Sequence, residues 1–153
     1  MEEEKSMEII SHSAEETFLI GKKIGENASP GLVIAFYGDL GAGKTVMTKG
    51  IARGLGIQGM ITSPTFTILQ IAEEGRLPLY HLDVYRIDDP DEMEEIGLDD
   101  CLYGGGVTVI EWAERIEELL PADTVRVTIE RLPENADTRR ITIENLRFEE
   151  KLR

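Results

Sequence analysis

The chain has 153 residues, of which 41% are apolar, and it carries a formal net charge of −14. That length suits one core, so we expect a single domain over residues 1–153. The negative charge argues against a broad electrostatic grip on nucleic acid or on an anionic membrane. No apolar run approaches membrane-spanning length, the first residues lack a signal-peptide layout, and the lone Cys101 has no disulfide partner. We therefore expect a cytoplasmic protein.

The N-terminal third predicts a strand, a helix and a second strand. Residues 7–11 fit a short strand, and Ser13 with Glu16 three residues later fits the capping box of a helix. Helical spacing continues until Asn27 and the Pro-Gly pair that follows. Residues 32–37 form a nearly continuous apolar run, which predicts a strand buried on both faces.

Residues 38–45, Gly-Asp-Leu-Gly-Ala-Gly-Lys-Thr, match the phosphate-binding loop pattern, between the strand at 32–37 and a helix-compatible run at 46–55. Glycines allow backbone N–H groups to approach phosphate oxygens, and the helix N-terminus adds positive potential. Lys44 suits the β- and γ-phosphate oxygens, and the Thr45 hydroxyl suits Mg²⁺. The alternative, a glycine-rich turn before an ordinary helix, fits these flanks poorly. The residues expected to contact the nucleotide in and after this loop are Asp39, Leu40, Gly41, Ala42, Gly43, Lys44, Thr45 and Val46.

The helix after the loop shows spacing of four between its apolar residues. Met47, Ile51 and Leu55 should therefore face the sheet. Gly50 and Gly54 predict a close approach of this helix to a strand, unless they simply weaken the end of the helix.

The middle of the chain predicts an antiparallel pair of strands, one in the β-branched run that follows Pro64 and ends at Ile71, the other at residues 77–86. On the second strand, alternation places His81, Asp83 and Tyr85 on one face. Two short acidic helices should follow, at residues 90–96 and 98–102.

The last third begins with a buried strand at residues 107–110, which ends at Glu111. Helical spacing runs from Trp112 to Pro121. Alternating apolar residues then predict an antiparallel hairpin, around 125–129 and 141–143, with one face exposed to water.

A phosphate loop needs an acid near its metal, commonly at the end of a neighbouring strand. Glu111 fits this role better than the alternative, an ion pair with Arg115 four residues later. Asp83 is the second candidate, either for the same ion or for the attacking water, although a solvated surface group is equally consistent. Thr65, in the loop after the first helix of the nucleotide unit, is a candidate sensor of the γ-phosphate. The sequence leaves the roles of His81, Arg86 and Trp112 open, although Trp112 stands beside Glu111.

Four motifs in order resemble the TsaE (YjeE) family, the ATPase component of bacterial tRNA threonylcarbamoyladenosine synthesis. They are the loop at 38–45, Ser-Pro-Thr-Phe at 63–66, His-Leu-Asp-Val-Tyr-Arg at 81–86 and Ile-Glu-Trp at 110–112. The resemblance covers most of the chain.

The resemblance implies a compact α/β fold of the phosphate-loop NTPase type with a mixed central sheet. Together with the predicted elements, we expect helices on both faces of that sheet and a C-terminal antiparallel hairpin. It implies ATP bound with Mg²⁺, and work alongside TsaB- and TsaD-type proteins that handle transfer to tRNA. It assigns Lys44 and Thr45 to phosphate and metal, Glu111 and Asp83 to the metal or hydrolytic water, and Trp112 to the vicinity of the nucleotide. It also places Thr65 near the γ-phosphate.

Two other functions share the phosphate loop. One is a nucleotide-dependent switch or assembly module in which hydrolysis is incidental, and the other is a small-molecule kinase. Kinases usually carry a lid with several arginines, whereas only Arg76 and Arg86 stand between Thr65 and Glu111. The acidic composition agrees with a subunit that meets tRNA only indirectly, through its partners.

Overall fold

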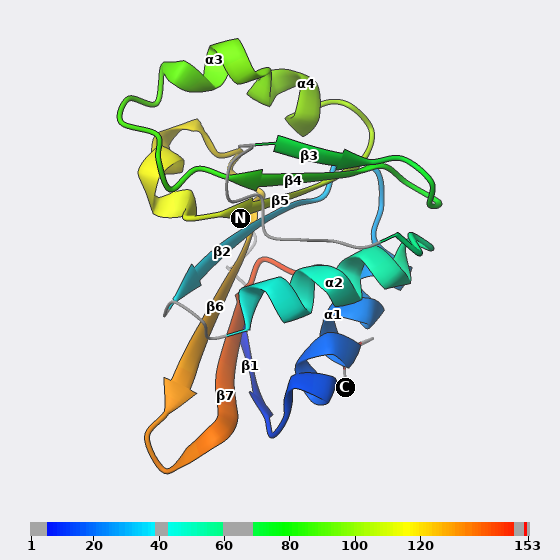
Figure 1. Ribbon diagram of the computed structural model, residues 1–153, viewed down its shortest axis with the longest axis vertical. Helices are drawn as coiled ribbons and strands as arrows, with labels where there is room; N and C mark the ends of the chain where they lie inside the picture. The colour runs from blue at the N-terminus through cyan, green and yellow to red at the C-terminus, as the bar shows by residue number, and fades with distance from the viewer. Residues whose placement is uncertain (1–5, 39–42, 60–68, 149–151, 153) are drawn as a thin grey trace.

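The structure, a computed structural model, describes residues 6–38, 43–59, 69–148 and 152, and these residues form a seven-stranded sheet (Figure 1). The strand order is β1-β7-β6-β2-β5-β4-β3. The strands are β1 (Ser6–Ser11), β2 (Val33–Gly38), β3 (Leu69–Ala72), β4 (Leu79–Asp83), β5 (Val107–Glu111), β6 (Val125–Leu132) and β7 (Asn135–Glu144). The helices are α1 (Ala14–Asn27), α2 (Lys44–Gly54), α3 (Glu92–Ile96), α4 (Leu98–Leu102) and the 3₁₀ helix η1 (Ala113–Leu119).

The sheet is mixed, as expected. The four strands β4, β5, β2 and β6 run parallel, while β3, β7 and β1 are antiparallel to their neighbours. The predicted pairing of the two middle strands is confirmed by β3 and β4, although residues 65–68 of the first lie outside the described part. The C-terminal hairpin is confirmed by β6 and β7, and β6 also pairs with β2, which joins the hairpin to the main sheet.

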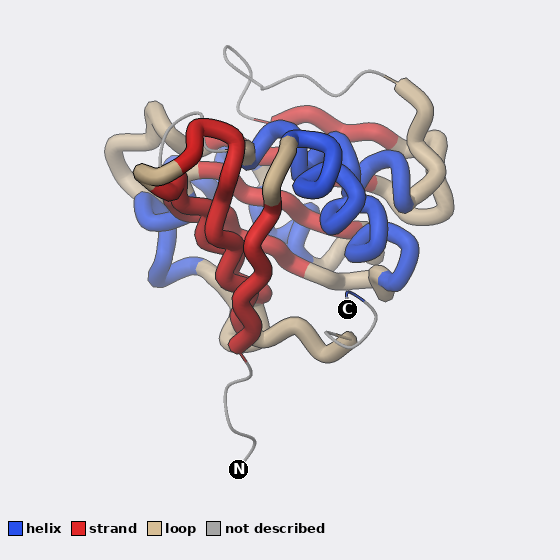
Figure 2. Tube along the Cα trace, turned by 90° about the horizontal axis from the view of Figure 1, so that it is seen from below, coloured by secondary structure: helices blue, strands red, loops and turns tan. Residues whose placement is uncertain are grey.

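Helices cover both faces of the sheet, with α1 and α2 on one face and α3, α4 and η1 on the other (Figures 1 and 2). The central strand β2 shows why both helix layers are needed. Its Ile34 and Phe36 belong to the core under α1 and α2, whereas Val33 and Ala35 belong to the core under the other helices. The prediction of a strand buried on both faces is therefore confirmed, and so is the α/β fold class. Among the described residues, none of the helices has the length and apolar character needed to cross a membrane.

The start of α1 confirms the predicted cap. The Ser13 hydroxyl accepts a hydrogen bond from the Glu16 N–H (3.1 Å), which satisfies one of the free amides of the first turn. The Glu16 carboxylate reaches back to the N–H of His12, one residue before the cap (2.6 Å). The helix then ends at Asn27, as predicted.

Four glycines form the contact between α1 and α2. A Cβ built on Gly50 would lie 2.1 Å from the carbonyl oxygen of Phe18, and one built on Gly54 would lie 2.2 Å from that of Lys22. Gly21 and Gly25 approach α2 just as closely, 2.3 and 2.2 Å from backbone carbonyl oxygens. The prediction that Gly50 and Gly54 allow a close helix–strand approach is thus wrong. Helical spacing shows that one face of α2 carries small residues, but it does not show which element packs against that face.

Arg76, in the β3–β4 connection, joins the ends of both helices. Its Nη2 donates to the carbonyl oxygens of Gly25 (2.8 Å) and Ala28 (3.0 Å), at the C-terminus of α1. Its backbone N–H donates to the carbonyl oxygen of Leu55, just after α2 (2.6 Å). A cation at a helix C-terminus satisfies free carbonyls and complements the helix dipole.

Candidate nucleotide-binding site

The carboxyl ends of three neighbouring parallel strands, β2, β5 and β4, lie together at one edge of the sheet (Figure 1). Glu111, the last residue of β5, is paired in register with Phe36 of β2 and with Asp83, the last residue of β4. The chain leaves β2 at this edge and enters α2. In open α/β sheets, ligands bind in this position, beyond the carboxyl ends of the strands.

The backbone on either side of the glycine-rich loop takes conformations that favour glycine. Gly38 closes β2 with φ +113°, and Gly43 precedes α2 with φ +122°. A Cβ on Gly38 would also lie 2.1 Å from the carbonyl oxygen of Ile129 in the adjacent strand. These two glycines are therefore required by the backbone path itself. The predicted contact residues Asp39, Leu40, Gly41 and Ala42 lie outside the described residues, as does Thr65.

The first turn of α2 carries Lys44, Thr45 and Val46. Lys44 is buried, with 7% of its surface exposed, and its Nζ lies 4.8 Å from the centroid of the Trp112 ring. This distance is within the range of a cation–π interaction. Thr45 and Val46 are half-buried. The structure thus brings Lys44 and Trp112 together from segments far apart in the sequence.

Glu111 is held by a histidine that the sequence left without a role. The Nε2 of His81 lies 2.7 Å from the Oε2 of Glu111, and both side chains are buried. The backbone of Glu111 is fixed as well, because its carbonyl oxygen accepts the N–H of Val84 (3.2 Å). The alternative of an ion pair between Glu111 and Arg115 is not what the structure shows, since the Arg115 guanidinium lies over the ring of Tyr85, 5.1 Å from its centroid.

Asp83 ends β4 and turns the chain. Its Oδ1 accepts the N–H of Tyr85 two residues later (3.0 Å), so this N–H is bound within the turn instead of to a neighbouring strand. The predicted strand at 77–86 is therefore shorter, and Tyr85 does not continue the face of His81 and Asp83. Burial raises the pKa of the Asp83 carboxyl above its usual value. The hydrogen bond from the Tyr85 N–H lowers this pKa, and the negative charge of Glu111 raises it, so the net shift is upward.

Trp112 follows Glu111 in a left-handed conformation, with φ +63° and ψ +36°. Such a backbone costs a non-glycine residue about 1–3 kcal/mol and is found preferentially at functional sites. The Trp112 ring packs against Tyr85, with 4.7 Å between centroids. The helix predicted from Trp112 to Pro121 is instead the 3₁₀ helix η1, with non-helical angles at Ile116, so periodicity located the element but not its type.

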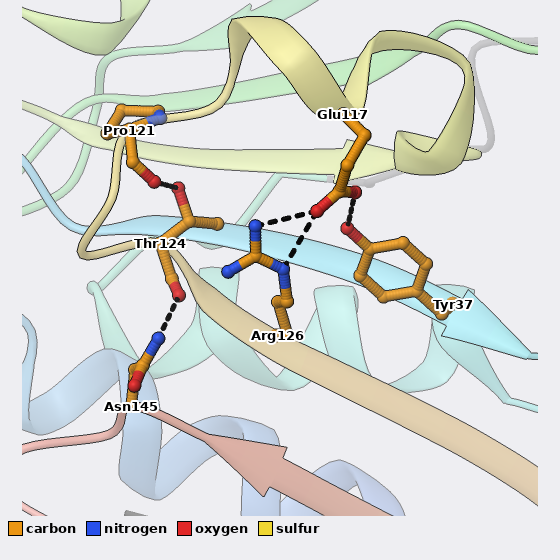
Figure 3. Close-up of polar contacts among 6 residues, drawn as sticks. All are labelled: Tyr37, Glu117, Pro121, Thr124, Arg126 and Asn145. Atoms are coloured by element: carbon orange, nitrogen blue, oxygen red, sulfur yellow. Dashed lines mark hydrogen bonds and ion pairs between the residues drawn. The ribbon is translucent and has the colours of Figure 1, made fainter. Parts of the chain in front are cut away.

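A polar cluster fastens η1 to the sheet. The Tyr37 hydroxyl donates to Oε2 of Glu117, and the Arg126 Nη2 donates to Oε1 of the same carboxylate (2.6 Å; Figure 3). Tyr37, Glu117 and Arg126, here called the η1 clip, thus connect β2, η1 and β6. Burial and the bond to Glu117 raise the pKa of Tyr37 far above its usual value. Partial burial works to raise the pKa of Glu117, but the bonds from Tyr37 and Arg126 outweigh it, so that the pKa of Glu117 lies below its usual value.

Two further hydrogen bonds, also drawn in Figure 3, fix the loop that follows η1. The Thr124 hydroxyl donates to the carbonyl oxygen of Pro121 (2.7 Å), and the Asn145 amide donates to that of Thr124 (3.1 Å). These bonds, with the η1 clip, hold the segment that follows Glu111 and Trp112.

The donors at this edge fit Mg²⁺ in kind. The carboxylates of Asp83 and Glu111 end adjacent strands, and hydroxyl and carboxylate oxygens are the ligands that Mg²⁺ prefers. Within the described ranges, no group of three or more His, Cys, Asp and Glu side chains could hold a metal alone.

Comparison with known proteins decides the family. The model of the family described as "Threonylcarbamoyl adenosine biosynthesis protein TsaE" matches residues 11–141. The chain belongs to the TsaE family. It is 50% identical over 128 residues to the TsaE protein of Bacillus subtilis, covering 84% of this chain and 78% of the relative. It is 45% identical over 137 residues to that of Treponema pallidum, covering 90% and 99%.

The TsaE fold is also that of a solved structure. The crystal structure of YdiB from Bacillus subtilis matches with a TM-score of 0.82 and 40% identity, over 99% of this chain and 94% of that one. The resemblance inferred from the four sequence motifs is confirmed, and with it a role in threonylcarbamoyladenosine biosynthesis. Sequence reasoning did not recognise His81 as the partner of Glu111, although strand alternation had placed it on the same face as Asp83.

Proposed function

We propose that this TsaE protein binds and hydrolyses ATP with Mg²⁺, as a step in forming threonylcarbamoyladenosine on tRNA. The observation that carries the proposal is the position of Lys44 at the first turn of α2, beside two strands that end in Asp83 and Glu111. An ammonium group and two carboxylates at the end of a parallel sheet form the minimum set for binding a triphosphate and its metal.

The Lys44 ammonium, now held on the Trp112 ring, has a stronger partner in phosphate oxygens, because two formal charges attract more strongly than a charge and a ring quadrupole. Thr45, Glu111 and Asp83 are proposed to hold Mg²⁺, which neutralises charge on the β- and γ-phosphate oxygens when bound. Trp112, fixed between Lys44 and Tyr85, forms one wall of the site.

The residues outside the described part complete the proposal. Asp39, Leu40, Gly41 and Ala42, together with the described Gly43, are proposed to surround the phosphates with backbone amides. Thr65 is proposed to respond to the γ-phosphate. Either Asp83 or Glu111 orients the attacking water.

The net charge of −14 supports indirect contact with tRNA. We propose that TsaB- and TsaD-type proteins bind the tRNA and carry out the transfer, in the cytoplasm, while this subunit supplies the ATP-driven step. A small-molecule kinase is disfavoured further by Arg76, one of the two candidate lid arginines, whose guanidinium already binds the end of α1.

The test is phosphate release from ATP and Mg²⁺, measured with and without TsaB and TsaD, for wild type and two variants. Lys44→Ala should weaken ATP binding about ten- to hundredfold, since a charge-assisted bond contributes about 1.5–3 kcal/mol. Glu111→Ala should reduce Mg²⁺-dependent turnover more than it reduces nucleotide binding in EDTA. Lys49→Ala, an exposed lysine on the same helix, is the matched control and should behave as wild type.

Three outcomes would contradict parts of this proposal. Unchanged ATP binding by Lys44→Ala would refute the site. Nucleotide-dependent assembly with TsaB and TsaD that continues when hydrolysis is blocked would favour the switch module. Transfer of labelled phosphate to a metabolite would favour the kinase.

A further inference from the structure

His81 is one of the least exposed polar residues near the site, with 1% of its surface accessible. It lies on β4, in register with Val109 of β5, two residues before Glu111. Its Nε2 contacts Glu111 Oε2 at 2.7 Å, which is a short, well-formed hydrogen bond. Because an ionised carboxylate only accepts hydrogen bonds, His81 must carry its proton on Nε2 to donate to it.

The other ring nitrogen shows that the histidine is not there for stability alone. His81 Nδ1 is buried and has no hydrogen-bond partner in the part of the chain that the structure describes. A buried polar atom without a partner typically costs about 1–3 kcal/mol. An apolar side chain would avoid that cost at this place on the sheet, where His81 is paired with Val109 of β5 and with Gln70 of β3.

The bond to Glu111 explains why a histidine is present. A glutamate side chain has several rotatable bonds, so the pairing of the Glu111 backbone in the sheet does not by itself fix its carboxylate. Fixing Oε2 removes that freedom and sets the position of Oε1. Carboxylates that ligate metals are commonly oriented by such outer hydrogen bonds, and loss of the outer partner typically costs about 10–100-fold in metal affinity or activity.

We propose that His81 is a positioning residue, which orients the Glu111 carboxylate for Mg²⁺ through the Nε2–Oε2 hydrogen bond. The proposal rests on the function proposed above, because it assumes that Glu111 meets the metal of a bound nucleotide. It does not depend on a change in protonation of either side chain.

Three substitutions separate positioning from packing. His81→Gln places an amide N–H near the position of Nε2, so it can still donate to Glu111. His81→Asn carries the same amide on a shorter side chain, which does not reach Oε2, and His81→Leu removes the donor altogether. The matched control is Thr108→Val. Thr108 lies on the same strand as Glu111, and this substitution removes the buried hydrogen bond from its hydroxyl to the Cys101 carbonyl oxygen.

The measurement is calorimetric binding of the non-hydrolysable ATP analogue adenylyl imidodiphosphate, in EDTA and over a Mg²⁺ titration. In EDTA, all variants should bind as wild type does. His81→Leu and His81→Asn should need about 10–100-fold more Mg²⁺ for its half-maximal effect. His81→Gln and Thr108→Val should stay close to wild type, and circular dichroism checks that each variant is folded.

The inference is overturned if His81→Asn needs no more Mg²⁺ than wild type, or if His81→Gln is impaired as much as His81→Asn. Equal losses in EDTA and in Mg²⁺ would show a general packing defect and would overturn it as well. The proposed function is tested separately by the wild-type protein. Absence of any Mg²⁺ effect on wild-type binding would refute the metal site, and this inference with it.

Discussion

Gly50 lies where α2 meets α1, so a methyl group added there tests how closely the two helices must pack. A Cβ at this position would lie 2.1 Å from the Phe18 carbonyl oxygen, whereas ordinary contacts begin at 3.4 Å. The two helices would therefore have to separate by roughly 1 Å, since a backbone carbonyl cannot rotate away as a side chain can. Because α2 begins at Lys44, that movement would also be felt at the nucleotide site.

Two opposing terms set the size of the effect of Gly50→Ala. Overpacking typically costs about 1–3 kcal/mol, and a clash between two backbones belongs at the upper end of that range. Alanine returns about 1 kcal/mol through its better helix propensity. The expected net loss is about 2 kcal/mol of unfolding free energy, which lowers the Tm by about 4–8 °C for a chain of this size.

The assay is unfolding by urea and by heat, followed by circular dichroism. Lys49→Ala is the control, because Lys49 is the exposed neighbour on the same helix and its change should stay within about 0.5 kcal/mol. A Gly50→Ala protein as stable as wild type, or more stable, would refute the reasoning. Helix propensity would then outweigh the close approach.

Three further substitutions test other contacts. Arg76→Ala should lose about 2 kcal/mol in urea unfolding, because charged hydrogen bonds to the α1 carbonyls are removed, and wild-type stability would refute that role. The pKa of Glu117 is lowered on folding, so its stabilisation is present above pH 4.5 and is lost as the pH falls through the folded pKa. The stability gap between wild type and Glu117→Gln should therefore close below pH 4.5, and a gap constant with pH would contradict this. The pKa of Asp83 is raised, so its ionised form opposes folding at neutral pH. Asp83→Asn should raise the Tm while lowering ATP turnover, and a lower Tm would argue against this sign.

Local patterns in the sequence were sufficient for much of the fold. The Ser13 cap, the doubly buried strand at 32–37 and the antiparallel hairpin at the C-terminus depend on neighbouring residues and on periodicity, and all three are confirmed. The loop at 38–45 was recognisable for the same reason, since its pattern lies within eight residues, and Gly38 and Gly43 have the positive φ angles that favour glycine.

Contacts between distant segments were not accessible in this way. Nothing near Gly50 in the sequence shows that α1 carries a matching pair of glycines, and nothing near Arg76 shows that two helices end beside it. The end of β4 at Asp83 was also misjudged, because one side-chain hydrogen bond outweighed the β propensity of the residues that follow.

The same distinction between local patterns and distant contacts applies to the candidate site. The sequence by itself determined the family, the identities of Lys44, Asp83 and Glu111 as candidates, and the places of Lys44 at the start of a helix and Glu111 at the end of a strand, because these follow from motif and periodicity. Only the tertiary structure decided that Lys44 lies on Trp112 and that His81, rather than Arg115, is the partner of Glu111. The physical reason is that strand register and helix packing bring together atoms that are 30 or more residues apart, and a linear pattern carries no record of which side chains meet.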